Sequence, residues 1–215
     1  MRAFEYVAAR DAGQAVALLA EHGASVKILA GGTDLLVELK SASHAPRMIV
    51  DISRATDLKN IALTNEGLSI GALVTHTEIM DSQLIRETFP ALADAAHTIG
   101  AVQTRNLGTL GGNLVTCVPS MDSGPTLIAL EALVTIAGPE GRRRMPLSAL
   151  FVGPRKTVLK PTELLVEIII PRRNLGKPAH FLKSGLRKGL ALALVNVAAS
   201  LWVDKKKNTF AEPRL

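Results

Sequence analysis

The sequence has one cysteine, few aromatic side chains and no apolar run of membrane-spanning length. Cys117 is alone among 215 residues, which excludes a disulfide framework and a cysteine-ligated zinc or iron–sulfur site within the chain. Aromatic residues make up 3% of the total, so binding of nucleic acid by base stacking is not expected despite a net charge of +6. The five histidines show neither HxxxH nor HxH spacing, so we expect no metal site.

Apolar stretches are short as well. The longest, residues 190–203, contains Asn196 and Ser200 and cannot span a bilayer. The N-terminal residues MRAFEYVAARD lack the apolar core of a signal peptide. We therefore expect a cytoplasmic protein without a transmembrane segment. Much of the positive charge lies in three clusters beside turn residues, which suit solvated hairpin ends or a face that docks a partner subunit: residues 142–144, 172–173 and 205–207.

Two glycine-rich stretches are the most distinctive feature. One reads TIGAVQTRNLGTLGGNLV from Thr98 to Val115, and the other, AGGTD at residues 30–34, follows the apolar run at 26–29. Glycine lets main-chain N–H groups approach a ligand that a β-carbon would hold off, and phosphate rewards this most. Two such stretches far apart in the chain suggest a long cofactor bound at both ends. Glycine pairs also mark ordinary turns and close backbone packing, and this alternative stays open.

Known phosphate motifs do not explain either stretch. No lysine follows either glycine pair, as the motif GxxxxGK with Ser or Thr requires, and GxGxxG is absent. A P-loop or Rossmann nucleotide site is therefore not supported.

Local patterns predict mixed helices and strands. Asp11 is suited to begin a helix that ends at Gly23, and a strand at 26–29 precedes a short helix at 35–40 that Thr33 or Asp34 could cap. Thr75 and Glu78 form a capping box. Other predicted helices lie at 90–97 and 124–131, the second with Asp122 as N-cap or as acceptor from ligand hydroxyls. The predicted strands lie at 48–52, 61–63, 68–74, 133–137, 142–146, 163–170, 180–186 and 190–203, with a polar linker at 172–178.

Five blocks, in order along the chain, resemble the FAD-binding (medium) subunits of molybdenum hydroxylases, the family of carbon monoxide dehydrogenase and xanthine dehydrogenase. They are KILAGGTDLLVELK (27–40), IGALVTHTEI (70–79), TLGGNLVTCVPSMDSGPTLIALEA (109–132), ELLVEIIIP (163–171) and FLKSGLRKGLALALVNVAA (181–199). The hydroxybenzoyl-CoA reductase members carry an iron–sulfur loop with several cysteines, which this chain lacks.

The resemblance implies an α+β fold of the p-cresol methylhydroxylase type. A small N-terminal FAD-binding subdomain would span residues 1–58 and a larger one 59–177, with FAD in the crevice between these two α/β units. Residues 178–215 would begin a C-terminal α/β domain that is incomplete here, because family members are longer. The chain is therefore interpreted as C-terminally truncated.

The resemblance also implies the cofactor contacts. The first FAD loop would comprise Leu29, Ala30, Gly31, Gly32, Thr33, Asp34, Leu35 and Leu36, and the second Thr109, Leu110, Gly111, Gly112 and Asn113, both wrapping the pyrophosphate with backbone amides. Asp122 would hold the adenosine end, and Ile99 and Leu165 would line the cofactor. Lys183 would lie near the flavin ring, where a cation favours negative charge on the reduced ring. Thr75 would also lie near the flavin.

The implied function is electron transfer. FAD would receive electrons from a [2Fe-2S] small subunit and pass them to a soluble acceptor such as NAD, a quinone or oxygen, while substrate is oxidised at a molybdopterin-binding large subunit. We expect no catalytic residue and no metal in this chain. Two alternatives stay open: a stand-alone flavoprotein oxidoreductase acting on its own small substrate, which the scarcity of Tyr disfavours, and a non-enzymatic nucleotide-binding scaffold.

Overall fold

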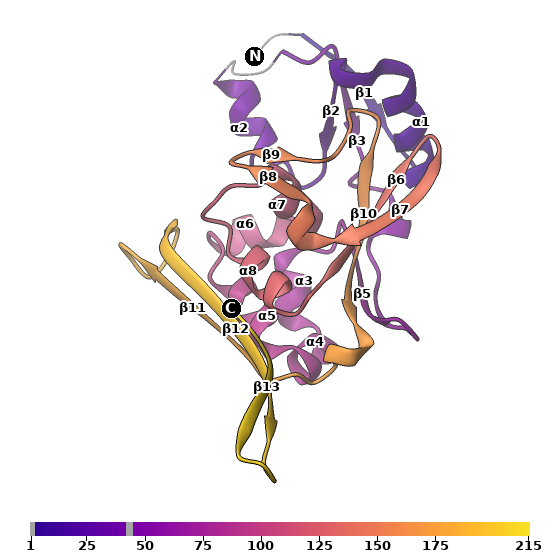
Figure 1. Cartoon of the computed structure of the whole chain (residues 1–215). Coiled ribbons are helices and arrows are strands. Elements are labelled where there is room, and N and C mark those ends of the chain that lie inside the picture. The colour runs from indigo at the N-terminus through magenta and orange to yellow at the C-terminus, as the bar shows by residue number, and fades with distance from the viewer. Residues whose placement is uncertain (1–2, 42–44) are drawn as a thin grey trace.

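The computed structural model describes residues 3–41 and 45–215. The N-terminal unit is a small parallel sheet of strand order β1-β3-β2 with two helices, at the top of Figure 1. Its elements are β1 (Glu5–Ala8), α1 (Ala12–His22), β2 (Val26–Leu29), α2 (Leu35–Lys40) and β3 (Met48–Asp51). Asp11 caps α1 through a hydrogen bond from the Gln14 amide, and Gly23 ends the helix with a φ of 54°. Both ends of this helix confirm the prediction.

A five-stranded antiparallel sheet forms the centre of the chain, in the order β4-β5-β10-β6-β7. Its strands are β4 (Ile61–Leu63), β5 (Gly67–Gly71), β6 (Leu133–Gly138), β7 (Gly141–Pro146) and β10 (Leu164–Pro171). The central strand β10 is buried apart from a half-buried Glu167. Glu167 accepts hydrogen bonds from the hydroxyls of Ser69 and Thr135 on the two flanking strands, so its carboxylate is satisfied inside the sheet.

Six short helices lie beside this sheet, and five of them contribute buried side chains to its main core, whereas the fourth, residues 102–107, contributes none. They are α3 (His76–Asp81), α4 (Gln83–Thr88), α5 (Pro90–His97), α6 (Val102–Leu107), α7 (Leu110–Thr116) and α8 (Ser123–Ala129). The capping box at Thr75 and the start of α5 at Pro90 both confirm the sequence prediction. A small hairpin, β8 (Phe151–Gly153) and β9 (Lys156–Thr157), lies near α7.

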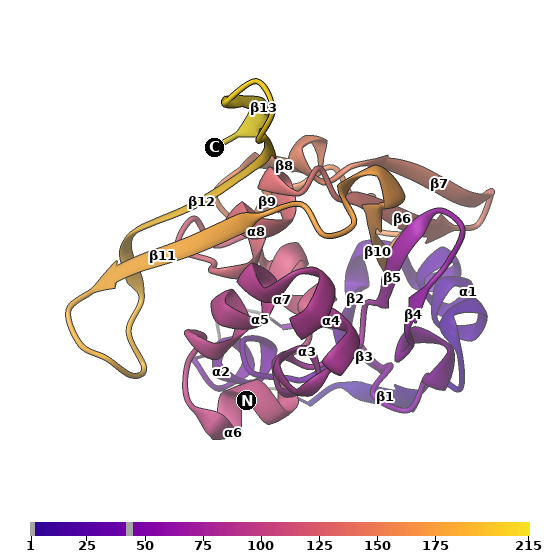
Figure 2. The same ribbon diagram turned by 90° about the horizontal axis from the view of Figure 1, so that it is seen from below.

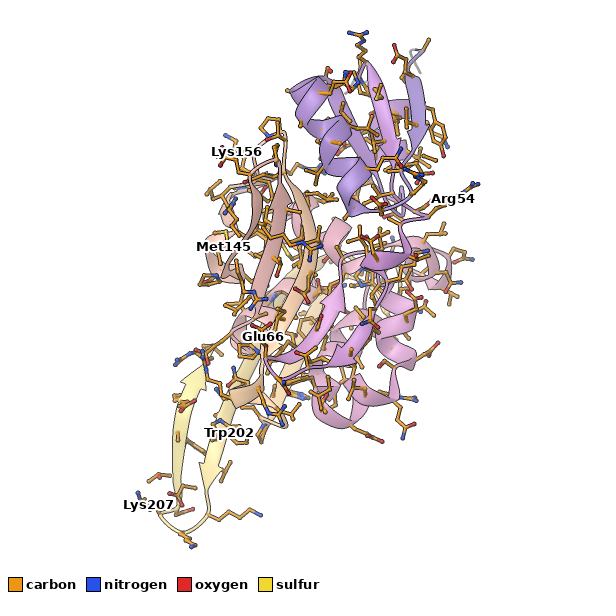
Figure 3. The ribbon with its side chains drawn as sticks, turned by 90° about the vertical axis from the view of Figure 1, so that its right-hand side faces the viewer. Arg54, Glu66, Met145, Lys156, Trp202 and Lys207 are labelled. Carbon is orange, nitrogen blue, oxygen red and sulfur yellow. The ribbon has the colours of Figure 1, made fainter. Side chains whose placement is uncertain are left out.

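The C-terminal segment is a three-stranded antiparallel sheet that packs on α5 and α8 (Figures 1 and 2). Its strands are β11 (Ala179–Gly185), β12 (Ala193–Asp204) and β13 (Thr209–Arg214). A buried cluster of Ala95, Ala129, Phe181 and Ala198 joins the sheet to the helices. Lys207, in the turn between β12 and β13, lies far from the rest of the chain (Figure 3).

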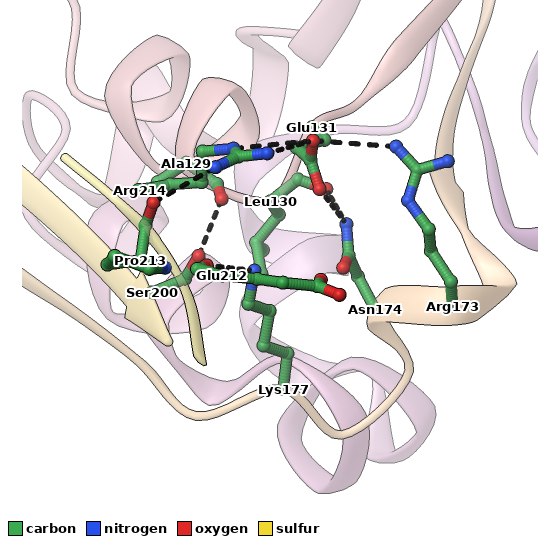
Figure 4. A network of polar contacts seen from close by, with 10 residues as sticks. All are labelled: Ala129, Leu130, Glu131, Arg173, Asn174, Lys177, Ser200, Glu212, Pro213 and Arg214. Atoms are coloured by element: carbon green, nitrogen blue, oxygen red, sulfur yellow. Dashed lines mark hydrogen bonds and ion pairs between the residues drawn. The ribbon is translucent and has the colours of Figure 1, made fainter. Parts of the chain in front are cut away.

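The segment predicted to be a polar linker is packed against the protein. Asn174 and Lys177 are both buried. Asn174 donates to the carbonyl of Leu130, and the Lys177 ammonium donates to the carbonyl of Glu212 in β13 (Figure 4). These polar residues hold the turn and the last strand in place, whereas the predicted domain boundary at residue 177 stays a prediction. The α+β fold class is confirmed.

Candidate cofactor site

The two glycine stretches meet in the structure. A β-carbon on Gly31 would overlap the carbonyl group of Leu107, at the end of α6. A β-carbon on Gly111 would lie 2.7 Å from both the β-carbon and the carbonyl oxygen of Ala72. At these two positions glycine is therefore required by close backbone packing, the alternative that the sequence left open.

The main cavity lies along this junction and has a volume of about 380 Å³. Its wall combines residues from the first glycine stretch, from α3, α6 and α7, from the approach to α8, and from the turn between β11 and β12. A smaller cavity of about 180 Å³ includes Thr75, Glu78 and Asn106 in its wall. Ala30, Gly31 and Thr109 belong to both walls, so one long ligand could occupy the two cavities.

The first glycine stretch offers free donors to the main cavity. The backbone N–H groups of Gly31, Gly32, Thr33 and Asp34 have no hydrogen-bond acceptor in residues 3–41 and 45–215. Gly32 has a φ of 72°, which favours glycine. Asp34 lies at the N-terminus of α2 but makes no side-chain capping bond, so of the two roles that the sequence left open for Thr33 and Asp34, capping is not found among the described residues. This stretch fits a ligand rich in phosphate oxygens.

The second glycine stretch does not form the open loop that we predicted. Residues 102–107 and 110–116 are helical, and Thr109 is the N-cap of α7, accepting a hydrogen bond from the Gly112 amide. The amides of Leu110 and Gly111 donate to the carbonyls of Val74 and Ala72. The amide of Asn113 donates to the carbonyl of Thr109. These four N–H groups are already bonded within the chain, so backbone donation to pyrophosphate from this stretch is not supported.

Asp122 and Lys183 form a buried ion pair at the edge of the main cavity. The Lys183 ammonium lies 2.6 Å from Oδ2 of Asp122, and the Asn196 amide donates to Oδ1 over 3.1 Å. Asp122 makes no capping bond to α8, although it occupies the N-cap position. The resemblance placed these two residues at opposite ends of the cofactor. Because they touch, both belong to the same end of the site.

The predicted contacts divide into two groups. Those in the wall of the main cavity are Ala30, Gly31, Gly32, Thr33, Asp34, Leu35, Ile99, Thr109, Gly112, Asn113 and Asp122. Those outside this wall are Leu29, Leu36, Thr75, Leu110, Gly111, Leu165 and Lys183. Of these, Leu110 and Leu165 are buried in the main core, and Thr75 lies in the smaller cavity. Lys183 reaches the site through Asp122.

Several parts of the wall were not predicted from the sequence, among them the segment at 118–121 next to Asp122, the turn between β11 and β12, and one histidine. The turn at Leu190–Leu192 belongs to the wall, and the Leu190 amide donates to the carbonyl of Gly100. No local pattern signals this contact, because the partners are far apart in sequence. His76 is a further omission, since the capping box explained its surroundings without a ligand. Burial and the nearby Arg105 lower the pKa of His76 to about 4, so the imidazole is neutral near pH 7.

Comparison with known proteins identifies the family of the chain. Residues 2–173 match the family described as the FAD binding domain in molybdopterin dehydrogenase. The carbon monoxide dehydrogenase medium chain of Hydrogenophaga pseudoflava is 38% identical over 168 residues, which cover 78% of this chain and 58% of that protein. The nicotinate dehydrogenase FAD-subunit of Eubacterium barkeri is 34% identical over 208 residues, covering 95% of this chain and 70% of that protein.

Solved structures of similar proteins have the same fold as this chain. A carbon monoxide dehydrogenase structure from Hydrogenophaga pseudoflava superposes with a TM-score of 0.91 at 33% identity, covering 99% of this chain and 73% of that one. Quinoline 2-oxidoreductase from Pseudomonas putida 86 gives a TM-score of 0.89 at 29% identity, covering 94% and 70%. The protein therefore belongs to the family of FAD-binding domains of molybdopterin dehydrogenases, which are parts of oxidoreductases and bind FAD as their cofactor.

Proposed function

We propose that this chain is the FAD-binding electron-transfer subunit of a cytoplasmic molybdenum hydroxylase. It takes electrons from a [2Fe-2S] small subunit and passes them to a soluble acceptor such as NAD, a quinone or oxygen. Substrate is oxidised on a molybdopterin-binding large subunit. The observation that carries the proposal is the pair of adjoining cavities at the glycine junction, with the unbonded amides of residues 31–34 in the wall of the larger one.

The residues around the cavity fit a bound cofactor better than side-chain catalysis. A nucleophile needs a base within hydrogen-bond reach, yet neither ring nitrogen of His76 makes a hydrogen bond within the described part of the chain. Donors without acceptors suit a ligand with many oxygen atoms. FAD supplies the redox chemistry when it is bound, since a flavin accepts single electrons and passes on a pair. The chain contributes binding and orientation.

Lys183 contacts the wall of the main cavity through Asp122, but it does not act as an isolated charge. Its ammonium is paired with Asp122 and also donates to the carbonyl of Thr98 over 3.1 Å. The carboxylate offsets most of the field that the ammonium would exert on a flavin ring. We therefore expect Lys183 to fix the position of the sheet more than to raise the flavin potential.

Cofactor binding is the first test. FAD is titrated into the purified chain while quenching of flavin fluorescence is followed, and any bound flavin is released by heat and identified. We expect saturable binding and two visible absorption bands. A chain that carries no flavin and does not bind added FAD would contradict the proposal.

Electron transfer is tested separately. The FAD-loaded chain is reduced and mixed with NAD⁺, a quinone or oxygen in turn, and the recovery of the oxidised flavin spectrum is timed. Mixing with purified molybdopterin and [2Fe-2S] subunits of a related enzyme, followed by gel filtration, tests assembly. Turnover of a small substrate by the isolated chain would instead favour a stand-alone flavoprotein.

A further inference from the structure

His76 is a buried histidine in the wall of the main cavity without a polar partner. It is the first residue of α3, and 2% of its surface is exposed. Its Nδ1 is sealed from solvent and makes no hydrogen bond. No hydrogen bond to Nε2 is found either in residues 3–41 and 45–215. Nε2, unlike Nδ1, is not sealed, and a buried histidine is normally paired, so the missing partner of Nε2 indicates a ligand that reaches this nitrogen from the cavity.

Hydrogen-bond donors lie close to His76, although the Thr33 hydroxyl also donates to the exposed carboxylate of Asp34 over 3.5 Å. A β-carbon on Gly108 would lie 3.4 Å from Cδ2 of His76 and 3.7 Å from the Thr33 hydroxyl, so ring and hydroxyl flank the same point. Thr33 itself lies among the four unbonded amides of the first glycine stretch. The charge of Arg105 acts on the ring as well, while its guanidinium donates to the carbonyl of Ile99.

We propose that His76 binds the diphosphate of FAD, with Nε2 donating a hydrogen bond to a phosphate oxygen. This inference rests on the proposed function, because it takes the main cavity to be the FAD site. Phosphate oxygens accept hydrogen bonds and carry negative charge, which suits a neighbourhood of N–H and O–H donors beside a guanidinium. The hydroxyls of a sugar would need acceptors as well as donors.

The state of the ring supports the same assignment. A neutral imidazole carries one N–H, and the position of the ligand decides which nitrogen bears it. With the proton on Nε2, the sealed Nδ1 is an unpaired acceptor, which proteins tolerate better than an unpaired N–H. The nearest carboxylate of the glycine stretch, Asp34, is exposed to solvent, so its repulsion of a diphosphate is screened.

The test compares ligands that differ in the diphosphate. FAD, ADP and riboflavin are titrated into the wild-type chain and into His76→Leu, His76→Gln and His97→Ala. Leu removes the hydrogen bond at similar volume, and Gln retains an N–H donor. His97, exposed at the end of α5, serves as the matched control. We expect His76→Leu to lower the affinity for FAD and for ADP by about 10-fold or more, as expected for the loss of a hydrogen bond to a charged group. His76→Gln should retain most of the affinity for FAD and ADP, and the affinity for riboflavin should not change in any variant.

A second measurement does not depend on a folded variant. The chain is labelled with ¹⁵N-histidine, and the imidazole signals are followed while ADP is added. We expect the His76 nitrogens to shift with ADP and not with riboflavin. Unchanged His76 signals, or equal loss of FAD and riboflavin affinity in His76→Leu, would overturn the inference. Failure of the wild-type chain to bind FAD would instead overturn the proposed function, and the inference with it.

Discussion

The ammonium of Lys183 lies 2.6 Å from the carboxylate of Asp122, a residue 61 positions earlier in the chain. The side chains are only 10% and 6% exposed. Asn196, the neighbour of Lys183 across strands β11 and β12, donates to the same carboxylate and to the carbonyl of Met121. One carboxylate thus fixes the C-terminal sheet to the segment before α8, and the turn of this sheet completes the wall of the main cavity.

The first prediction concerns this pair. Asp122→Asn and Lys183→Met each leave a buried charge without its partner, and we expect each to lower the free energy of unfolding by about 3 kcal/mol. The double variant should lose clearly less stability than the two single losses added together, since neither buried charge remains in it. Urea unfolding measures all three. Lys207→Met, which removes an exposed partner 4.0 Å from Asp204, is the control and should change little. Additive losses would show that the pair is not coupled.

The second prediction concerns the glycine junction. Gly31→Ala places a methyl group against the Leu107 carbonyl, which is backbone and cannot turn aside. We expect the free energy of unfolding to fall by about 2 kcal/mol or more. FAD binding should also weaken, because the walls of both cavities must shift. Gly153→Ala is the matched control, since a β-carbon there meets nothing within 4 Å. Equal behaviour of the two variants in denaturant unfolding and FAD titration would refute the role of the junction.

The elements best predicted from sequence are those set by neighbouring residues. The capping box of Thr75 and Glu78, the Asp11 cap and the start of α5 at Pro90 each depend on side chains within one turn. The second glycine stretch was mispredicted because its helices have six and seven residues and three glycines at or near their ends. Helices this short depend on tertiary contacts, here the bonds to Ala72 and Val74, which no local pattern reveals.

The candidate site could likewise be predicted only in part, because some of its contacts join distant parts of the chain. The resemblance identified nearly half of the residues in the cavity wall, since glycine and polar residues there form continuous blocks of sequence. The resemblance could not reveal that Asp122 is already paired with Lys183, or that Leu165 lies in the core. Side-chain pairing between distant elements depends on the packed fold. The wall residue His76 was overlooked because a capping motif already explained its position.

The third prediction concerns pH and His76. Burial lowers the pKa of this ring in the folded chain to about 4, below its usual 6.5. The unfolded chain therefore binds the proton first, and the stability that is present above pH 6.5 is lost as the pH falls toward 4. The loss amounts to about 2 kcal/mol between pH 7 and pH 5.

His76→Gln should flatten this part of the pH profile, while His97→Gln should leave it unchanged. Chemical unfolding at half-unit pH steps measures the slope. The acidic side chains with lowered pKa values, among them Glu163 and Asp51, add their own loss only at lower pH. A slope that persists in His76→Gln between pH 7 and pH 5 would refute the assignment to His76.

The last prediction separates internal from external roles of the basic hairpin strand β7. Arg143 makes two hydrogen bonds of 2.9 Å to Glu163, and Arg144 makes two to Glu66. The Arg143 guanidinium also lowers the pKa of Glu163. Arg142 is exposed and has no ion-pair partner in the described residues. Reversing all three charges would set carboxylates against carboxylates, so a loss of assembly could not be assigned to docking.

Arg142→Glu alone tests the docking role. We expect the free energy of unfolding to stay within about 0.5 kcal/mol, as for most surface substitutions. If this face docks an acidic partner subunit, the dissociation constant of the complex should rise severalfold and depend more weakly on salt. Arg143→Glu is the comparison, because it should destabilise the chain itself by repulsion from Glu163. Assembly with the molybdopterin and [2Fe-2S] subunits is measured by gel filtration at low and high salt, and unchanged assembly of Arg142→Glu would exclude this face as the docking surface.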